Sequence, residues 1–132
     1  MQWHIDAGTK TKQYIAALLP SMLAQLKLDS SRTHLQIIVD KDIEHTGQTI
    51  PLTGINTILV VIKPTRNKLE LGITLAHELA HVAQFAKGTL KCTPKGKRWK
   101  GRYYGRSVAY LDQPWEIDAF SRQEIIFRRA IE

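Results

Sequence analysis

The spacing of apolar residues alternates along the chain between helix-like and strand-like segments. Between residues 9 and 28, apolar residues recur every three or four positions, which predicts a helix. Pro20 lies inside this segment, so we expect a kink or two shorter helices there. Strands are predicted at 34–39, where apolar and polar residues alternate, and at 56–62, which is rich in β-branched residues. The polar segment 40–54 is expected to form a loop or a short extra strand.

The second half of the chain predicts a long helix, a hairpin and a final helix. Asn67 and Glu70 have the spacing of a capping box at the start of a helix that should end at Gly88. Residues 91–110 are rich in glycine and aromatic residues and predict a loop followed by a β-hairpin. The last helix should begin at Pro114, because proline is favoured at the first helical position. This order of elements predicts one small α+β domain over residues 1–132, with its central helix packed on a short mixed sheet.

The central helix contains the sequence His77-Glu78-Leu79-Ala80-His81. Residues four positions apart lie on one face of a helix, so both imidazoles can reach one metal ion. Glu78 borders this face, where its carboxylate can accept a proton from a water that the metal activates. Zinc suits the two histidines, since imidazole is a good ligand for it and an open coordination position is tolerated. The motif therefore predicts one catalytic Zn²⁺ per chain, and two histidines without a metal remain the alternative.

A catalytic zinc ion commonly has three protein ligands, so a third ligand is expected outside the motif. Glu116 shares a helix face with mainly apolar residues, where a carboxylate is costly unless it meets a cation. We therefore predict Glu116 as the third ligand. Asp118 lies on a more polar face and is expected to pair with Arg122 or to support one of the metal-binding histidines. Further candidates are Asp112, Glu124, Cys92, His34 and His45. Of these we expect Cys92 to be a bystander and His45 to be exposed, and His4 and His34 belong to no motif.

Two segments of the chain resemble the active-site segments of zincin metallopeptidases. Residues 74–84, Thr-Leu-Ala-His-Glu-Leu-Ala-His-Val-Ala-Gln, resemble the zincin active-site helix. Residues 110–119, Tyr-Leu-Asp-Gln-Pro-Trp-Glu-Ile-Asp-Ala, resemble the third-ligand helix of small gluzincin-type members, and distantly similar families are the SprT-like and ImmA/IrrE-type peptidases of bacteria and phages. The chain departs from the metzincin pattern at Gln84 and Lys87, and Phe120 stands where ImmA-type peptidases have asparagine.

The resemblance implies that the protein hydrolyses peptide bonds in a protein or peptide substrate, with Glu78 as the general base. It also implies that an extended substrate pairs with an edge strand above the cleft, and we predict strand 56–62 for this role. A hydrogen-bond donor to the oxyanion is needed as well. Tyr103, Tyr104 and Tyr110 are the candidates, and the sequence does not choose among them.

The net charge of +7 is concentrated in one segment. Residues 87–106 hold eight of the 19 basic residues, and no acidic residue lies between positions 79 and 111. Such a run is often only a solvated surface, but its cations and aromatic rings could also bind nucleic acid or another acidic partner. This leaves two alternative functions: a nucleic-acid-associated binding protein with a zincin-like or structural zinc site, and a zincin that binds without cleaving.

Cysteine content and hydropathy bear on the compartment. Cys92 is the single cysteine, so no internal disulfide can form. The first residues lack the pattern of a signal peptide, and the longest apolar run, 58–62, is too short to cross a bilayer. From these features we expect a cytoplasmic protein that does not associate with membranes.

Overall fold

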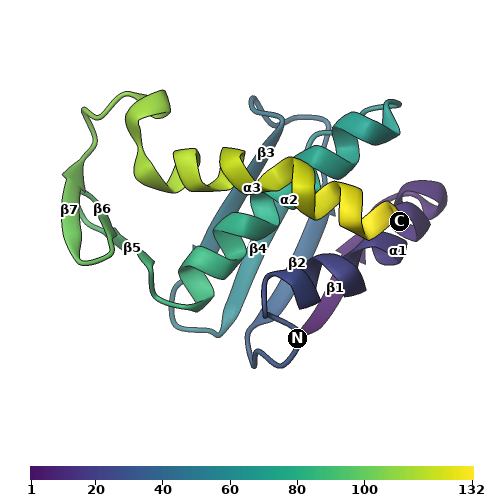
Figure 1. The fold of residues 1–132 in the computed structure, drawn as a ribbon, viewed down its shortest axis with the longest axis horizontal. Helices are drawn as coiled ribbons and strands as arrows, with labels where there is room; N and C mark the ends of the chain where they lie inside the picture. The colour runs from purple at the N-terminus through teal and green to yellow at the C-terminus, as the bar shows by residue number, and fades with distance from the viewer.

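A mixed four-stranded sheet supports the helices (Figure 1). The structure is a computed structural model that describes residues 1–132. The strands lie in the order β1 (Gln2–Asp6), β2 (His34–Val39), β4 (Thr57–Ile62) and β3 (Gly47–Leu52). The pairs β1–β2 and β2–β4 are parallel, whereas β3 runs antiparallel to β4. The predicted α+β class, with a central helix on a short mixed sheet, is therefore confirmed.

The sheet corrects one expectation about the cleft. Strand 56–62 was expected at an edge, but β4 pairs with β2 on one side and with β3 on the other. Its apolar sequence fits this interior position, because a strand that is paired on both edges and largely buried needs few polar residues. The free edge beside the central helix belongs to β3, the short extra strand within residues 40–54.

The first helix, α1 (Thr9–Gln25), is continuous through Pro20. Of the two alternatives expected at Pro20, a kink or two shorter helices, the second is wrong, because one helix continues through this residue. The helix ends earlier than predicted. Lys27 adopts a left-handed conformation with φ of 57°, which terminates the helix and directs Leu28 back to the core.

The central helix, α2 (Lys68–Ala86), begins and ends as the sequence predicts. The Asn67 side chain accepts a hydrogen bond from the backbone N–H of Glu70 at 3.1 Å, and Gly88 follows the last turn with φ of 75°. One face of α2 packs on the sheet, where Leu75, Leu79 and Val82 are fully buried.

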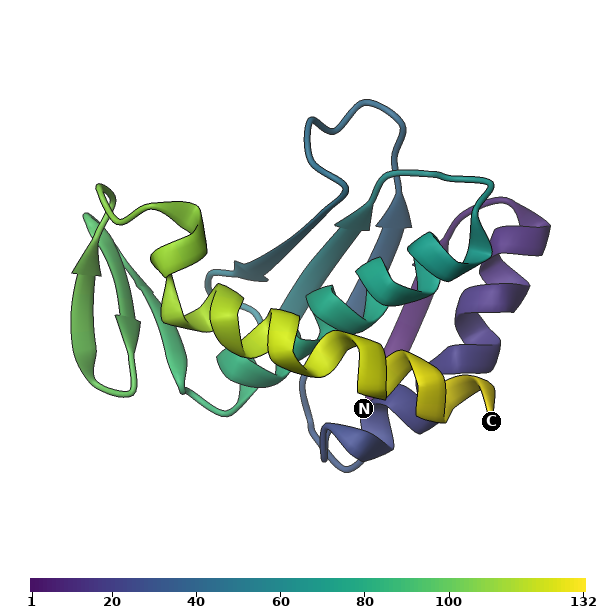
Figure 2. The ribbon, with the colours of Figure 1, turned by 45° about the horizontal axis from the view of Figure 1, so that its top comes forward.

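The last helix, α3 (Pro114–Ile131), packs against α2 and α1 (Figure 2). Gly72 allows this approach, because a Cβ atom there would lie 2.0 Å from the ring of the buried Phe127. The Gly72–Phe127 contact sets the distance between the two helices that carry the candidate ligands. None of the helices combines the length and the apolar character needed to cross a membrane.

Between α2 and α3 the chain forms a small antiparallel sheet that projects from the body of the molecule (Figure 1). It consists of three strands rather than the two of the predicted hairpin, namely β5 (Leu90–Thr93), β6 (Gly96–Trp99) and β7 (Arg102–Gly105). We call these three strands and their turns the basic extension. A short 3₁₀ helix, η1 (Tyr110–Asp112), links it to α3.

Candidate metal centre

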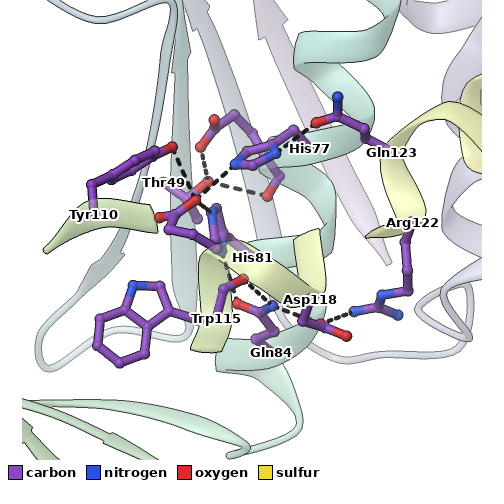
Figure 3. A network of polar contacts seen from close by, with 11 residues as sticks. Thr49, His77, His81, Gln84, Tyr110, Trp115, Asp118, Arg122 and Gln123 are labelled. Carbon is purple, nitrogen blue, oxygen red and sulfur yellow. Dashed lines mark hydrogen bonds and ion pairs between the residues drawn. The ribbon is translucent and has the colours of Figure 1, made fainter. Parts of the chain in front are cut away.

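Three potential metal ligands meet where the first turn of α3 crosses α2 (Figure 3). Glu116 Oε1 lies 2.9 Å from His77 Nε2 and 3.0 Å from His81 Nε2. The ligand atoms of all three residues lie within 4.8 Å of one another, and each residue is at most 9% exposed. Two imidazoles and one carboxylate in this arrangement can hold a metal ion. Cys92 and the histidines outside the motif do not join the group.

The neighbours of His81 determine which of its ring nitrogens faces Glu116. The Gln84 amide nitrogen donates to the Trp115 carbonyl at 3.0 Å and to Asp118 Oδ2 at 2.8 Å. These bonds fix the orientation of the amide, so Gln84 Oε1 faces His81 Nδ1 at 2.8 Å as an acceptor. Nδ1 therefore carries a hydrogen, which leaves Nε2 as the nitrogen that faces Glu116 and can bind a metal.

The same arrangement recurs at His77, whose Nδ1 lies 2.8 Å from Gln123 Oε1. With both Nδ1 atoms protonated, two neutral imidazoles would point lone pairs at one carboxylate oxygen, which is repulsive. A cation among the three atoms removes this repulsion, either as extra protons on the rings or as a metal ion. Ligand atoms of a tetrahedral zinc site lie about 3.3 Å apart for bonds of about 2.0–2.1 Å, so a metal requires the two distances to Glu116 to lengthen by only a few tenths of an ångström.

The pKa values of Glu116 and His77 reflect the attraction between a carboxylate and a protonated imidazole ring. Burial alone would raise the pKa of Glu116, but hydrogen bonds from His77 and His81 and their charge outweigh burial and lower it to about 2. Burial lowers the pKa of His77, but the hydrogen bond to Glu116 and the charge of Glu78 raise it on balance. Glu116 is thus an anion over the whole physiological range, as a metal ligand must be.

Glu78 is a second buried carboxylate beside the ligand group. Thr49, on the edge strand β3, donates its hydroxyl to Glu78 Oε1 at 2.8 Å. The carboxylate is close to β3 at another point as well, because a Cβ atom at Gly47 would lie 2.9 Å from Glu78 Oε2. Burial raises the pKa of Glu78, partly offset by the charge of His81 and by the bond from Thr49.

The three tyrosines considered for oxyanion stabilisation differ in position. The Tyr110 hydroxyl donates to Glu116 Oε1 at 3.1 Å, and burial and the charge of Glu116 raise its pKa to about 12. Tyr103 instead bonds to a backbone carbonyl of the basic extension, and Tyr104 packs edge-on against Trp115. Only Tyr110 lies at the ligand group.

A cleft of about 820 Å³ opens over the three ligands. The edge strand β3 forms one wall, α2 and α3 form the floor, and Lys97 of the basic extension reaches the rim together with Trp115. His45 lines this cleft without joining the ligands. The three ligands are therefore largely buried by the protein, but a molecule in the cleft can reach them.

The structure also reveals contacts that the sequence did not predict. Thr49 and Gln123 hold Glu78 and His77, and neither has a recognisable spacing to its partner. Gln123 does share a helix face with Glu116, seven positions earlier, which is a signal that could have identified it. Asp118 pairs with Arg122 at 2.8 Å and contacts Gln84, so it reaches His81 through one intermediate side chain.

Comparisons of this chain with protein-family models, with curated proteins and with solved structures found no match. Function lies in a site rather than in a fold, so the geometry of the ligand group and of Glu78 is what bears on the function of this chain.

Proposed function

We propose that this protein is a zinc-dependent metallopeptidase of the gluzincin type, which hydrolyses peptide bonds. The observation that carries the proposal is the convergence of His77 Nε2, His81 Nε2 and Glu116 Oε1 beside a further buried carboxylate, Glu78. Two imidazoles and one carboxylate are a donor set that zinc takes in catalytic sites. The separate carboxylate supplies the base that such chemistry needs.

The number of ligands supports a catalytic zinc site over a structural one. Structural zinc is usually enclosed by four Cys or His side chains, whereas three protein groups converge here beneath an open cleft. In a structural site Glu78 would be a buried carboxylate with no role, which is costly. The alternative of a nucleic-acid-associated protein with structural zinc is therefore less well supported.

Glu78 is positioned to act as the general base. When bound, zinc supplies Lewis acidity, which lowers the pKa of a water and polarises a carbonyl group. Thr49 occupies Oε1 of Glu78, which leaves Oε2 to take a proton from the attacking water and to pass it to the leaving amine. Gly47 leaves room for Oε2, and the raised pKa of Glu78 makes it a stronger base than an exposed glutamate.

Tyr110 and β3 would orient the substrate. The pKa of Tyr110 near 12 keeps its hydroxyl protonated at neutral pH, so it can donate a hydrogen bond to an oxyanion that develops on the substrate. An extended peptide would add to the free edge of β3 by backbone hydrogen bonds. This role replaces the one expected for strand 56–62.

The proposal is tested with zinc-loaded protein and a mixture of peptides, with products identified by mass spectrometry. We expect the wild type to cleave peptides and Glu78→Gln to lose at least about 100-fold in rate while it keeps its zinc, because a base is not a ligand. Glu70→Gln, an exposed change on the same helix, is the matched control and should retain activity. Equal rates for Glu78→Gln and the wild type would remove Glu78 from the mechanism.

A further inference from the structure

The charges that line the cleft are unevenly distributed. Glu78 and Glu116 lie on its floor, and Glu44 lies on its lining near the start of β3. Lys97 is the one lysine or arginine among the 19 lining residues. It forms no ion pair, because the ion pairs of the chain involve other residues. The cleft therefore presents a single cation that has no anionic partner in the chain.

Lys97 is held in place by its surroundings. It pairs with Cys92 and Tyr104 across the basic extension, and its ammonium group lies 5.1 Å from the centre of the Trp115 ring. The Lys97 residue is half-buried, and the indole beneath it is 3% exposed. A half-buried cation at a fixed position attracts an anion more strongly than a mobile surface lysine does.

A second hydrogen-bond donor without an acceptor lies beside Lys97. Trp115 Nε1 is buried and has no hydrogen-bond partner in the chain, although buried donors nearly always have one. Figure 3 shows this nitrogen on the side of the indole ring that faces Tyr110. An acceptor group entering the cleft at this end would lie close to both donors.

A smaller hollow of about 310 Å³ lies beyond the cleft. It shares Phe85 and Leu90 with the cleft, so the two adjoin, and Lys91 contributes to its lining. Its lining also includes Leu52 at the end of β3. Lys91 pairs with Arg98, next to the Cys92–Lys97 pair, so its side chain leaves the basic extension on the opposite face from that of Lys97. Lys97 is therefore the lysine that faces the cleft.

We propose that the cleft selects peptides with an acidic side chain on one side of the scissile bond, and that Lys97 binds this side chain. This inference rests on the proposed peptidase function and adds its substrate class. The acidic side chain lies at the Lys97 end of the cleft. Glu44, at the opposite end, disfavours acidic residues there by charge repulsion.

The aromatic residues of the basic extension favour a peptide over nucleic acid as the acidic partner. Binding of single strands depends on exposed aromatic faces on which bases stack. Here Lys100 lies over the Trp99 ring at 5.6 Å, Tyr104 packs against Trp115, and the Tyr103 hydroxyl bonds to the backbone. Trp99 and Tyr104 are thus engaged within the protein, whereas Tyr103 is 46% exposed. A single open ring does not provide a platform for successive bases.

The test compares peptides that differ only by Glu, Gln or Lys at each position around the cleaved bond. We expect the wild type to prefer Glu over Gln by about three- to ten-fold in kcat/KM on one side only, with a preference that weakens as salt rises. Lys97→Gln should remove the preference and Lys97→Glu should reverse it toward Lys. Lys95→Gln, an exposed change in the same extension that lines neither hollow, should retain the wild-type preference. Unchanged zinc content and melting temperature show that each variant is folded.

Binding measured without turnover separates this inference from the proposed function. Fluorescence anisotropy with zinc-loaded Glu78→Gln protein compares a Glu-containing peptide with its Gln counterpart, with and without Lys97→Gln. Tighter binding of the Glu peptide that depends on Lys97 supports the inference even if no peptide is cleaved. Equal binding of the two peptides, or a preference that persists in Lys97→Gln, overturns it. A single-stranded oligonucleotide that binds more tightly than an acidic peptide of equal charge also overturns it.

Discussion

Gln84 accepts a hydrogen bond from His81 Nδ1 at 2.8 Å, and this contact determines which nitrogen of His81 is available to a metal. The amide of Gln84 is held in turn by two oxygens of α3, at Trp115 and Asp118. The helix that carries Glu116 therefore also orients a histidine of α2. Because both effects depend on how α3 docks, the candidate metal centre and the packing of the two helices are coupled.

The first prediction concerns Gln84. Gln84→Leu should weaken zinc affinity by about 10- to 100-fold, because His81 loses the acceptor that fixes its tautomer and ring orientation. Gln123→Leu should weaken it less, since Gln123 has no second contact that fixes its amide. Competition with a chromophoric chelator measures both affinities, and Gln13→Leu on the exposed face of α1 serves as the control. The opposite ranking would show that the contact with Gln84 does not orient the ligand.

The second prediction ranks the two acidic residues of α3. Glu116→Ala should reduce zinc affinity by about ten-fold or more, because it removes a direct ligand. Asp118→Ala should reduce it less, because Asp118 acts only through Gln84. The same chelator competition gives both values, and a larger loss for Asp118→Ala would mean that it, rather than Glu116, completes the site.

The third prediction links Thr49 to the pH dependence of hydrolysis. The general base must be ionised, so activity falls as the pH drops through the pKa of Glu78. The bond from Thr49 stabilises the carboxylate and lowers its pKa. Thr49→Val should therefore raise this pKa and shift the acid limb of kcat/KM to higher pH, with zinc content unchanged. If the acid limb does not move in Thr49→Val, a group other than Glu78 is responsible for it.

The fourth prediction concerns the space beside Glu78. Gly47→Ala would place a methyl group 2.9 Å from Glu78 Oε2, so the carboxylate must move. We expect a loss of about ten- to 100-fold in kcat, since a small misplacement of a catalytic group is costly, with little loss of zinc. Gly8→Ala, which meets no atom within 4 Å, is the matched control. Loss of zinc in Gly47→Ala would instead indicate a distorted α2.

The elements that carry the ligands were predictable from the sequence because local signals define them. Helix α2 has an Asn67 cap, a terminating Gly88 and histidines at a spacing that only a helix brings to one face. Helix α3 starts at Pro114, and the apolar neighbours of Glu116 direct its carboxylate inward. These signals depend on residues within a few positions of one another.

The sequence left residues 40–54 open between a loop and a short extra strand. The edge position of this strand and the contacts around the ligands were not predictable, because they depend on pairings that are distant in sequence. Strand β3 contains Gly47 and Pro51, and its polar composition is typical of a loop. Its pairing with β4 creates the strand. Thr49 meets Glu78 across 29 positions, and no periodicity encodes that distance.

Zinc content is the most direct test of the central claim, that His77, His81 and Glu116 hold one zinc ion. Protein stripped with a chelator and dialysed against a limited excess of Zn²⁺ is analysed for zinc per chain by elemental analysis, beside His77→Ala and His81→Ala. The geometry predicts about one zinc per chain in the wild type and a large loss in both variants. A folded wild type that takes up no zinc, or variants that retain as much as the wild type, would contradict it.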